Sequence, residues 1–154
     1  MALILPLLMT LMFGSFELAS YFWTEHKVVK GVRDGARFAA RLSFSNYICG
    51  EAVSDAALET RIKEVTRTGV VSGGTATIAN WGNDDVTITV SCPDTALDGS
   101  GDGQVTTGIY QNQPNAPIVR VSTTVGYMTL FETLGFDATE LNVSASSQAA
   151  VMGF

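Results

Sequence analysis

The first 23 residues are apolar on every side of any helix that they could form. In the run MALILPLLMTLMFGSFELASYFW the only ionisable side chain is Glu17. At about 1.5 Å per residue the run spans roughly 35 Å, enough to cross a bilayer core of about 30 Å. It closes on Tyr21, Phe22 and Trp23, and such a cluster is typical of a membrane–water boundary. The pattern predicts a membrane-spanning helix over residues 1–23.

A cleavable signal peptide is the alternative interpretation of the same run. No basic residue precedes the apolar positions, and no small-residue cleavage site follows a stretch of suitable length, so we favour the helix. Pro6 removes one backbone donor, and Gly14 permits either a flexible point or a close approach of another helix. We therefore expect both among the subunit or membrane contacts.

From residue 24 the predicted helix continues with two unlike sides and ends near residues 44–46. Five basic residues are spaced by three or four positions, so they line one side. They are Lys27, Lys30, Arg33, Arg37 and Arg41. Apolar residues supply the other side. Residues 24–46 are thus the amphipathic half of a helix over 1–46, and this length indicates a membrane span that continues into a domain, or part of a bundle.

The remaining residues, 47–154, predict a head with one short helix and four to five antiparallel strands. A helix is expected over 54–68, between a serine N-cap and a terminating glycine. Apolar positions then alternate with a period of two, which is typical of strands. The predicted strands are 75–79, 85–91, 105–110, 118–127 and 141–151. The sequence therefore predicts an α+β fold, with an antiparallel sheet packed on the outer half of the long helix.

Cys49 and Cys92 are the two cysteines of the chain. An even pair in a chain that crosses a membrane favours one disulfide, and two buried free thiols are the alternative. The disulfide would close a loop of about 44 residues and add roughly 3–4 kcal/mol in the chain-entropy model. It would tie the end of the long helix to a strand. His26, the only histidine, is far from both cysteines in sequence, which argues against a metal site there.

Charge and motifs exclude several function classes. The net charge of −6 argues against nucleic acid as a partner, because phosphate binding needs clustered Lys and Arg on a basic domain. His26 is a poor candidate for a general base, and neither a P-loop nor a dinucleotide-binding glycine motif follows a strand. We therefore expect no enzymatic activity, no catalytic residue and no organic cofactor.

Calcium is the one cofactor that a motif suggests. The loop DGSGDGQV places Asp98, Ser100 and Asp102 at the first, third and fifth positions of a calcium loop, with glycine at the sixth. The twelfth position is Ile109, so the bidentate glutamate of such a loop is missing. An ordinary acidic turn is the alternative, and it is the one we favour.

Several segments, in this order, resemble the TadE-like pilin family of tight-adherence pilus systems. The apolar opening with its early proline, residues 2–8, is similar to the family's start, and Gly14 with Glu17 reproduces its G-x-x-E step. Residues 32–41, VRDGARFAAR, match its V-R-[DE]-G-A-R-[YF]-A-A-R motif. Two late segments, 118–127 and 141–149, resemble its closing strands more weakly, and they follow in the expected order.

The resemblance implies a type IV pilin-like fold and a structural role in pilus assembly and surface attachment. It implies anchoring in the inner membrane with the head in the periplasm, followed by a place in an extracellular filament. The expected partners are other pilin subunits, identical or different, and membrane lipid before assembly. A monomeric membrane-anchored adhesin or periplasmic binding module is the alternative.

Glu17 and the basic side are the features through which that role would act. A charged group at the centre of a spanning helix costs about 2.5–3.5 kcal/mol, so Glu17 either pairs with a neighbouring subunit or stays protonated in lipid. A carboxyl that only extends toward the headgroups is the alternative. The basic side could hold anionic headgroups or an acidic partner. Alternatively, it is a solvated helix face with Glu25 and Asp34 as local partners.

Overall fold

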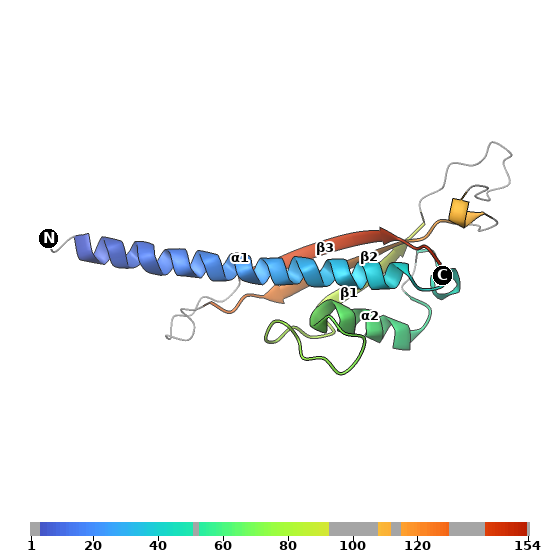
Figure 1. Cartoon of the computed structure of the whole chain (residues 1–154), viewed down its shortest axis with the longest axis horizontal. Helices are drawn as coiled ribbons and strands as arrows, with labels where there is room; N and C mark the ends of the chain where they lie inside the picture. Colours follow the sequence, from blue (N-terminus) through green and yellow to red (C-terminus); the bar gives the residue numbers. More distant parts are fainter. Residues whose placement is uncertain (1–3, 51–52, 93–107, 112–114, 130–140, 154) are drawn as a thin grey trace.

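The computed structural model describes residues 4–50, 53–92, 108–111, 115–129 and 141–153. One helix, α1 (Ile4–Ala40), forms the long axis of the molecule, and the described parts of the head lie along its C-terminal half (Figure 1). The head contains helix α2 (Ala56–Thr68) and strands β1 (Val86–Ser91), β2 (Ile118–Gly126) and β3 (Asn142–Ala150). Short 3₁₀ turns cover Phe44–Asn46 and Gly108–Tyr110. The predicted α+β fold, with its long helix, second helix and antiparallel sheet, is confirmed.

The sheet is antiparallel in the order β1-β2-β3, with β2 in the centre. Valines and isoleucine alternate with polar residues along β1 and β2, so that one face of each strand is buried and the other is exposed. Val121 of β2 pairs with Ile88 on one side and with Ser147 on the other. The buried face joins Val28 and Val32 of α1 in a single core.

Two glycines let α1 and α2 cross at very short range. A Cβ atom added to Gly31 would lie 2.2 Å from the Thr66 carbonyl oxygen and 2.8 Å from the Trp81 ring. A Cβ added to Gly35 would lie 2.0 Å from the Thr66 hydroxyl oxygen. Thr66 is buried, and its hydroxyl donates to the Ile62 carbonyl at 2.8 Å. The spacing Gly-x-x-x-Gly therefore serves an intramolecular helix contact in this half of α1.

The α-helix ends at Ala40, earlier than the expected end near residues 44–46. The backbone N–H of Leu42 donates to the Ala39 carbonyl at 3.0 Å, which tightens the last turn. The Met152 N–H donates to the Ala40 carbonyl at 2.8 Å, and the Tyr47 hydroxyl donates to the Ala39 carbonyl. Groups outside α1 thus satisfy the carbonyls of Ala39 and Ala40, which would accept hydrogen bonds from the next helical residues if α1 continued. Burial raises the pKa of the Tyr47 hydroxyl well above its usual range.

The predicted strand over 75–79 is wrong. Both the N–H and the hydroxyl of Thr77 donate to the Arg67 carbonyl, at 2.9 and 3.1 Å, so this segment closes the end of α2 without joining the sheet. The next residues bring Trp81 into the core, where its indole N–H donates to Thr123 Oγ1 at 3.0 Å.

The predicted strand at 105–110 is also not seen in its described part, where residues 108–110 form a 3₁₀ turn. Its first residues, 105–107, lie outside the described residues. The strands predicted at 85–91, 118–127 and 141–151 correspond to β1, β2 and β3. The sheet in the described chain has three strands, whereas four to five were predicted.

The structure contains the disulfide between Cys49 and Cys92, with Cα atoms 5.5 Å apart. Cys49 follows the 3₁₀ turn after α1, and Cys92 follows the last residue of β1. The neighbouring Gly50 N–H donates to the Val90 carbonyl at 3.3 Å, which holds the same two segments together. The covalent link therefore joins the end of α1 to the sheet.

Candidate functional site

The N-terminal half of α1 is an apolar surface with little protein around it. Every side chain from Ile4 to Phe16 is exposed, with Leu5 and Leu11 at 65% and 64%. By length and composition α1 is able to cross a membrane, and its most apolar stretch is not buried inside the molecule. We call residues 4–16 the exposed apolar segment. Its exposure indicates that another apolar medium, lipid or protein, covers it.

Pro6 and Gly14 lie in this segment in different ways. Pro6 lies in the first described turn of α1, and the Thr10 hydroxyl donates to its carbonyl at 2.9 Å. Among the described residues, a Cβ added to Gly14 would meet nothing within 4 Å. Gly14 is thus not required for packing against the described head, in contrast to Gly31 and Gly35. Its small size leaves room for a close approach from outside.

Glu17 lies where the head first reaches the helix. Its side chain is half-buried, and the Tyr127 hydroxyl donates to its backbone carbonyl at 3.3 Å. Burial raises the pKa of the Tyr127 hydroxyl, a hydrogen bond with Ser20 lowers it, and the adjacent Glu17 carboxyl raises it. Tyr127 follows β2, so the structure places Glu17 at the tip of the sheet. Sequence reasoning named Glu17 but missed Tyr127, because nothing in the sequence indicates that contact.

Four aromatic side chains surround α1 at nearly the same height. Tyr127 packs edge-to-face against Tyr21, with ring centroids 5.3 Å apart. Phe22 and Trp23 are exposed, at 49% and 66%, and helical spacing places them on the sides that the head leaves open. We call Tyr21, Phe22, Trp23 and Tyr127 the aromatic collar. The aromatic collar separates the exposed apolar segment from the charged half of the helix.

Four basic residues of α1, and Arg41 directly after it, are directed away from the core. Lys30, Arg33, Arg37 and Arg41 are exposed, and Lys27 is half-buried. They line the side opposite to the buried Val28 and Val32, as predicted. Within the described ranges the one ion pair is Lys63–Glu59 of α2, at 2.8 Å, and neither Glu25 nor Asp34 forms one with these basic residues. We call the five residues the basic face.

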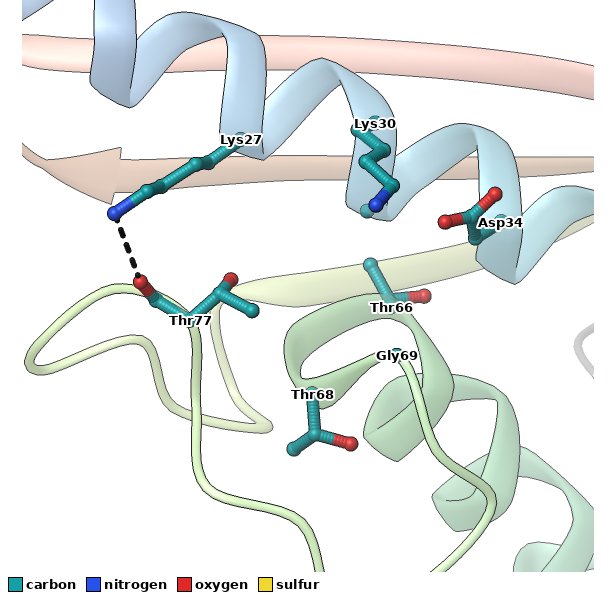
Figure 2. A pocket seen from close by; sticks show the side chains of 8 residues that line it. Lys27, Lys30, Asp34, Thr66, Thr68, Gly69 and Thr77 are labelled. Carbon is teal, nitrogen blue, oxygen red and sulfur yellow. Dashed lines mark hydrogen bonds between the residues drawn. The ribbon is translucent and has the colours of Figure 1, made fainter.

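A small hollow of 180 Å³ lies where the basic face meets the end of α2 (Figure 2). Lys27 reaches across it, with its Nζ 3.5 Å from the Thr77 carbonyl oxygen. Lys30 and Asp34 line the α1 side, and Gly69 ends α2 on the other. The C-terminus of a helix carries partial negative charge, which favours the lysine side chains there. The hollow serves the contact between the helices and provides no set of groups for catalysis.

The calcium candidates Asp98, Ser100 and Asp102 lie outside the described residues. Among the residues that are described, no group of three or more His, Cys, Asp or Glu side chains is arranged to hold a metal ion.

Comparison with known families finds a match in the N-terminal part of the chain. Residues 1–37 match the TadE-like protein family. Residues 1–37 include the exposed apolar segment, the α1 residues of the aromatic collar and most of the basic face. They also include Gly31 and Gly35, so the TadE-like segment includes the glycines on which α2 rests.

The TadE-like match ends at residue 37 and does not extend to the sheet. The resemblance of 118–127 and 141–149 to the family's closing strands therefore stays a prediction. No curated protein and no solved structure matches the chain.

Proposed function

We propose that this chain is a pilin-like structural subunit of a bacterial tight-adherence pilus. The observation that carries the proposal is the exposed apolar segment: a helical stretch, in the part of the chain that matches the TadE-like family, in which every side chain is exposed. In a bilayer this segment is stable because an α-helix satisfies its own backbone hydrogen bonds. In a filament the same surface packs against helices of other subunits.

The chain in the bilayer and the chain in the filament differ in what covers the exposed apolar segment. In lipid, neighbouring chains gain nothing from the hydrophobic effect, so association depends on close packing and on polar contacts between helices. Gly14 offers the space for close packing, and Glu17 places a carboxyl, already beside the Tyr127 hydroxyl, at the edge of the same surface. By helical spacing both positions lie on the same side of α1 as Val32 and Gly35, which the head covers farther along the helix, so a second subunit would meet Gly14 N-terminal to the described head and Glu17 at its edge.

The rest of the proposal follows from this arrangement. Before assembly the chain is held in the inner membrane with its head in the periplasm, and afterwards it is part of an extracellular pilus that acts in surface attachment. Its partners are other pilin subunits, identical or different, and lipid. The chain carries no enzymatic activity, and its disulfide suits an oxidising compartment.

The test is to shear surface filaments from cells and to search them for peptides of this chain by mass spectrometry. The expected result is recovery of the chain in the filament fraction, together with its loss from that fraction when pilus assembly is blocked. Recovery in the membrane fraction alone would contradict the proposal. That result would favour a monomeric membrane-anchored adhesin or binding module.

A further inference from the structure

The aromatic collar marks a height along α1. From Ile4 to Trp23 the helix contains 20 residues and rises about 30 Å, which equals the thickness of a bilayer core. Aromatic side chains gather at membrane–water boundaries. In the anchored subunit, the collar therefore lies at the outer boundary of the hydrocarbon.

A second hollow opens directly beyond the collar, on the side of α1 away from the core. It has a volume of 260 Å³ and is lined by Trp23, His26, Lys27 and Lys30. The Lys27 ammonium lies 5.8 Å from the centre of the Trp23 ring, and its bond to the Thr77 carbonyl fixes its position. The hollow combines an aromatic wall with ammonium groups, and it continues the surface that faces lipid.

The height of these residues matches the headgroup layer. His26, Lys27 and Lys30 lie about 4.5, 6 and 10 Å beyond Trp23 along the helix axis, and the polar layer on each side of a bilayer is about 5–8 Å thick. Long lysine side chains span the remaining distance. The other basic residues, Arg33, Arg37 and Arg41, lie about 15, 21 and 27 Å beyond Trp23, farther than the screening length of about 8–10 Å.

We propose that this hollow binds the headgroup phosphate of an anionic phospholipid. The Lys27 and Lys30 ammonium groups and the His26 ring meet the phosphate, while Trp23 packs against the glycerol and upper acyl region. Of the two carboxylates near these residues, helical spacing places Glu25 toward the head, and Asp34 lies one turn beyond Lys30. The inference rests on the membrane-anchored stage of the proposed function, and it gives that stage a specific lipid partner.

An acidic surface of another subunit is the competing occupant of the basic face. Such a surface would engage Arg37 and Arg41 as strongly as the lysines, because all are exposed or half-exposed along one side. A lipid headgroup reaches only the residues nearest to the collar. The two occupants therefore differ in the basic residues that contribute to binding: a lipid headgroup depends on Lys27 and Lys30, and an acidic subunit depends on Arg37 and Arg41 as well.

The experiment uses the full chain in vesicles of equal parts phosphatidylglycerol and phosphatidylcholine, with one of the two lipids brominated at a time. Bromine quenches the fluorescence of Trp23 beside it, whereas Trp81 is buried in the head and is not reached. The variants Lys30→Gln and Arg37→Gln each remove one positive charge from an exposed position of the same helix side. Neither residue donates a hydrogen bond in the described chain, so both variants should fold, and Lys27→Gln serves as a second test.

The expected result is that phosphatidylglycerol is preferred beside Trp23 by at least about fivefold, since one cation near the surface contributes about that factor. Lys30→Gln and Lys27→Gln each lower the preference by about fivefold, and Arg37→Gln leaves it unchanged. Equal quenching by both lipids would overturn the inference alone. An equal effect of Arg37→Gln would assign the preference to diffuse charge and would also overturn it. A chain that does not insert would overturn both the inference and the anchored stage.

Discussion

Replacement of Gly35 by alanine tests whether the close crossing of α1 and α2 holds the head on the helix. The new Cβ would lie 2.0 Å from the Thr66 hydroxyl oxygen and 3.1 Å from the Thr66 Cβ, so the Thr66 side chain must rotate or α2 must shift. Such overpacking costs about 1–3 kcal/mol, and the higher helix propensity of alanine returns about 1 kcal/mol. Thr66 is buried and bonded within its own helix, so we place the net loss in the free energy of unfolding at about 2 kcal/mol.

The assay is chemical denaturation of the full chain in detergent micelles, followed by the near-ultraviolet circular dichroism of the buried Trp81. Thr66→Ala removes the hydroxyl that Gly35→Ala would strike, so the double variant should recover about 1 kcal/mol relative to the sum of the single changes. Gly31→Ala strikes the Thr66 backbone carbonyl at 2.2 Å, and Thr66→Ala should not rescue it. Gly14→Ala is the matched control, since no described residue lies within 4 Å of its Cβ, and it should leave the head's stability unchanged.

The reasoning would be refuted by a Gly35→Ala protein as stable as the original, or by a rescue of Gly31→Ala as large as that of Gly35→Ala. The first result would mean that α2 does not rest on this part of α1. The second would mean that the loss does not arise from contact with the Thr66 hydroxyl.

Three further predictions concern the links between head and helix. Replacement of Cys49 and Cys92 by serine should lower the free energy of unfolding by about 3–4 kcal/mol, and urea denaturation with and without reductant checks this against the closed loop. Tyr127→Phe removes the hydroxyl that donates to the Glu17 carbonyl, so hydrogen exchange around residues 17–21 should rise while the stability loss stays near 1 kcal/mol. Burial raises the pKa of both Tyr47 and Tyr127, so the folded state keeps protons that the unfolded state loses above about pH 10. Stability should therefore be intact below pH 10 and fall above it, and Tyr47→Phe should weaken that pH dependence in a titration of the unfolding midpoint.

The parts of the fold that depend on local pattern could be predicted from the sequence. The apolar run and the regular spacing of basic residues identify α1, and alternating apolar positions identify the three strands. The end of α1 could not be predicted, because the carbonyls of Ala39 and Ala40 are met by Tyr47 and Met152. The second of these partners lies at the far end of the chain.

The false strand over 75–79 has a similar cause. Its alternation is real, but the Arg67 carbonyl at the end of α2 takes the Thr77 N–H that a sheet partner would have used. Tertiary contact therefore decides against the local preference.

The candidate surface divides in the same way. Gly14, Glu17 and the basic face could be singled out from the sequence, because small size, charge and regular spacing are visible there. The contact of Tyr127 with Glu17 joins residues 110 positions apart and has no sequence signal. The pair Gly31 and Gly35 did carry a signal, the four-residue spacing of glycines on one helix side, although the spacing does not tell which helix it receives.

The central claim is that the exposed apolar segment is covered by lipid before assembly and by other subunits in the filament. Both native cysteines are in the disulfide, so Met12→Cys introduces the one free thiol of the chain, at an exposed position of that segment. The other pilus subunits of the same cells carry a cysteine in their own apolar helices. A bifunctional thiol reagent is applied to membranes and to sheared filaments of these cells, so that the membrane-anchored chain and the assembled chain are compared. The account predicts cross-linked subunits in the filaments and little cross-linking in membranes where assembly is blocked. Filaments that contain the chain but yield no cross-link at Met12, nor at Leu8 on the same helix side, would contradict it.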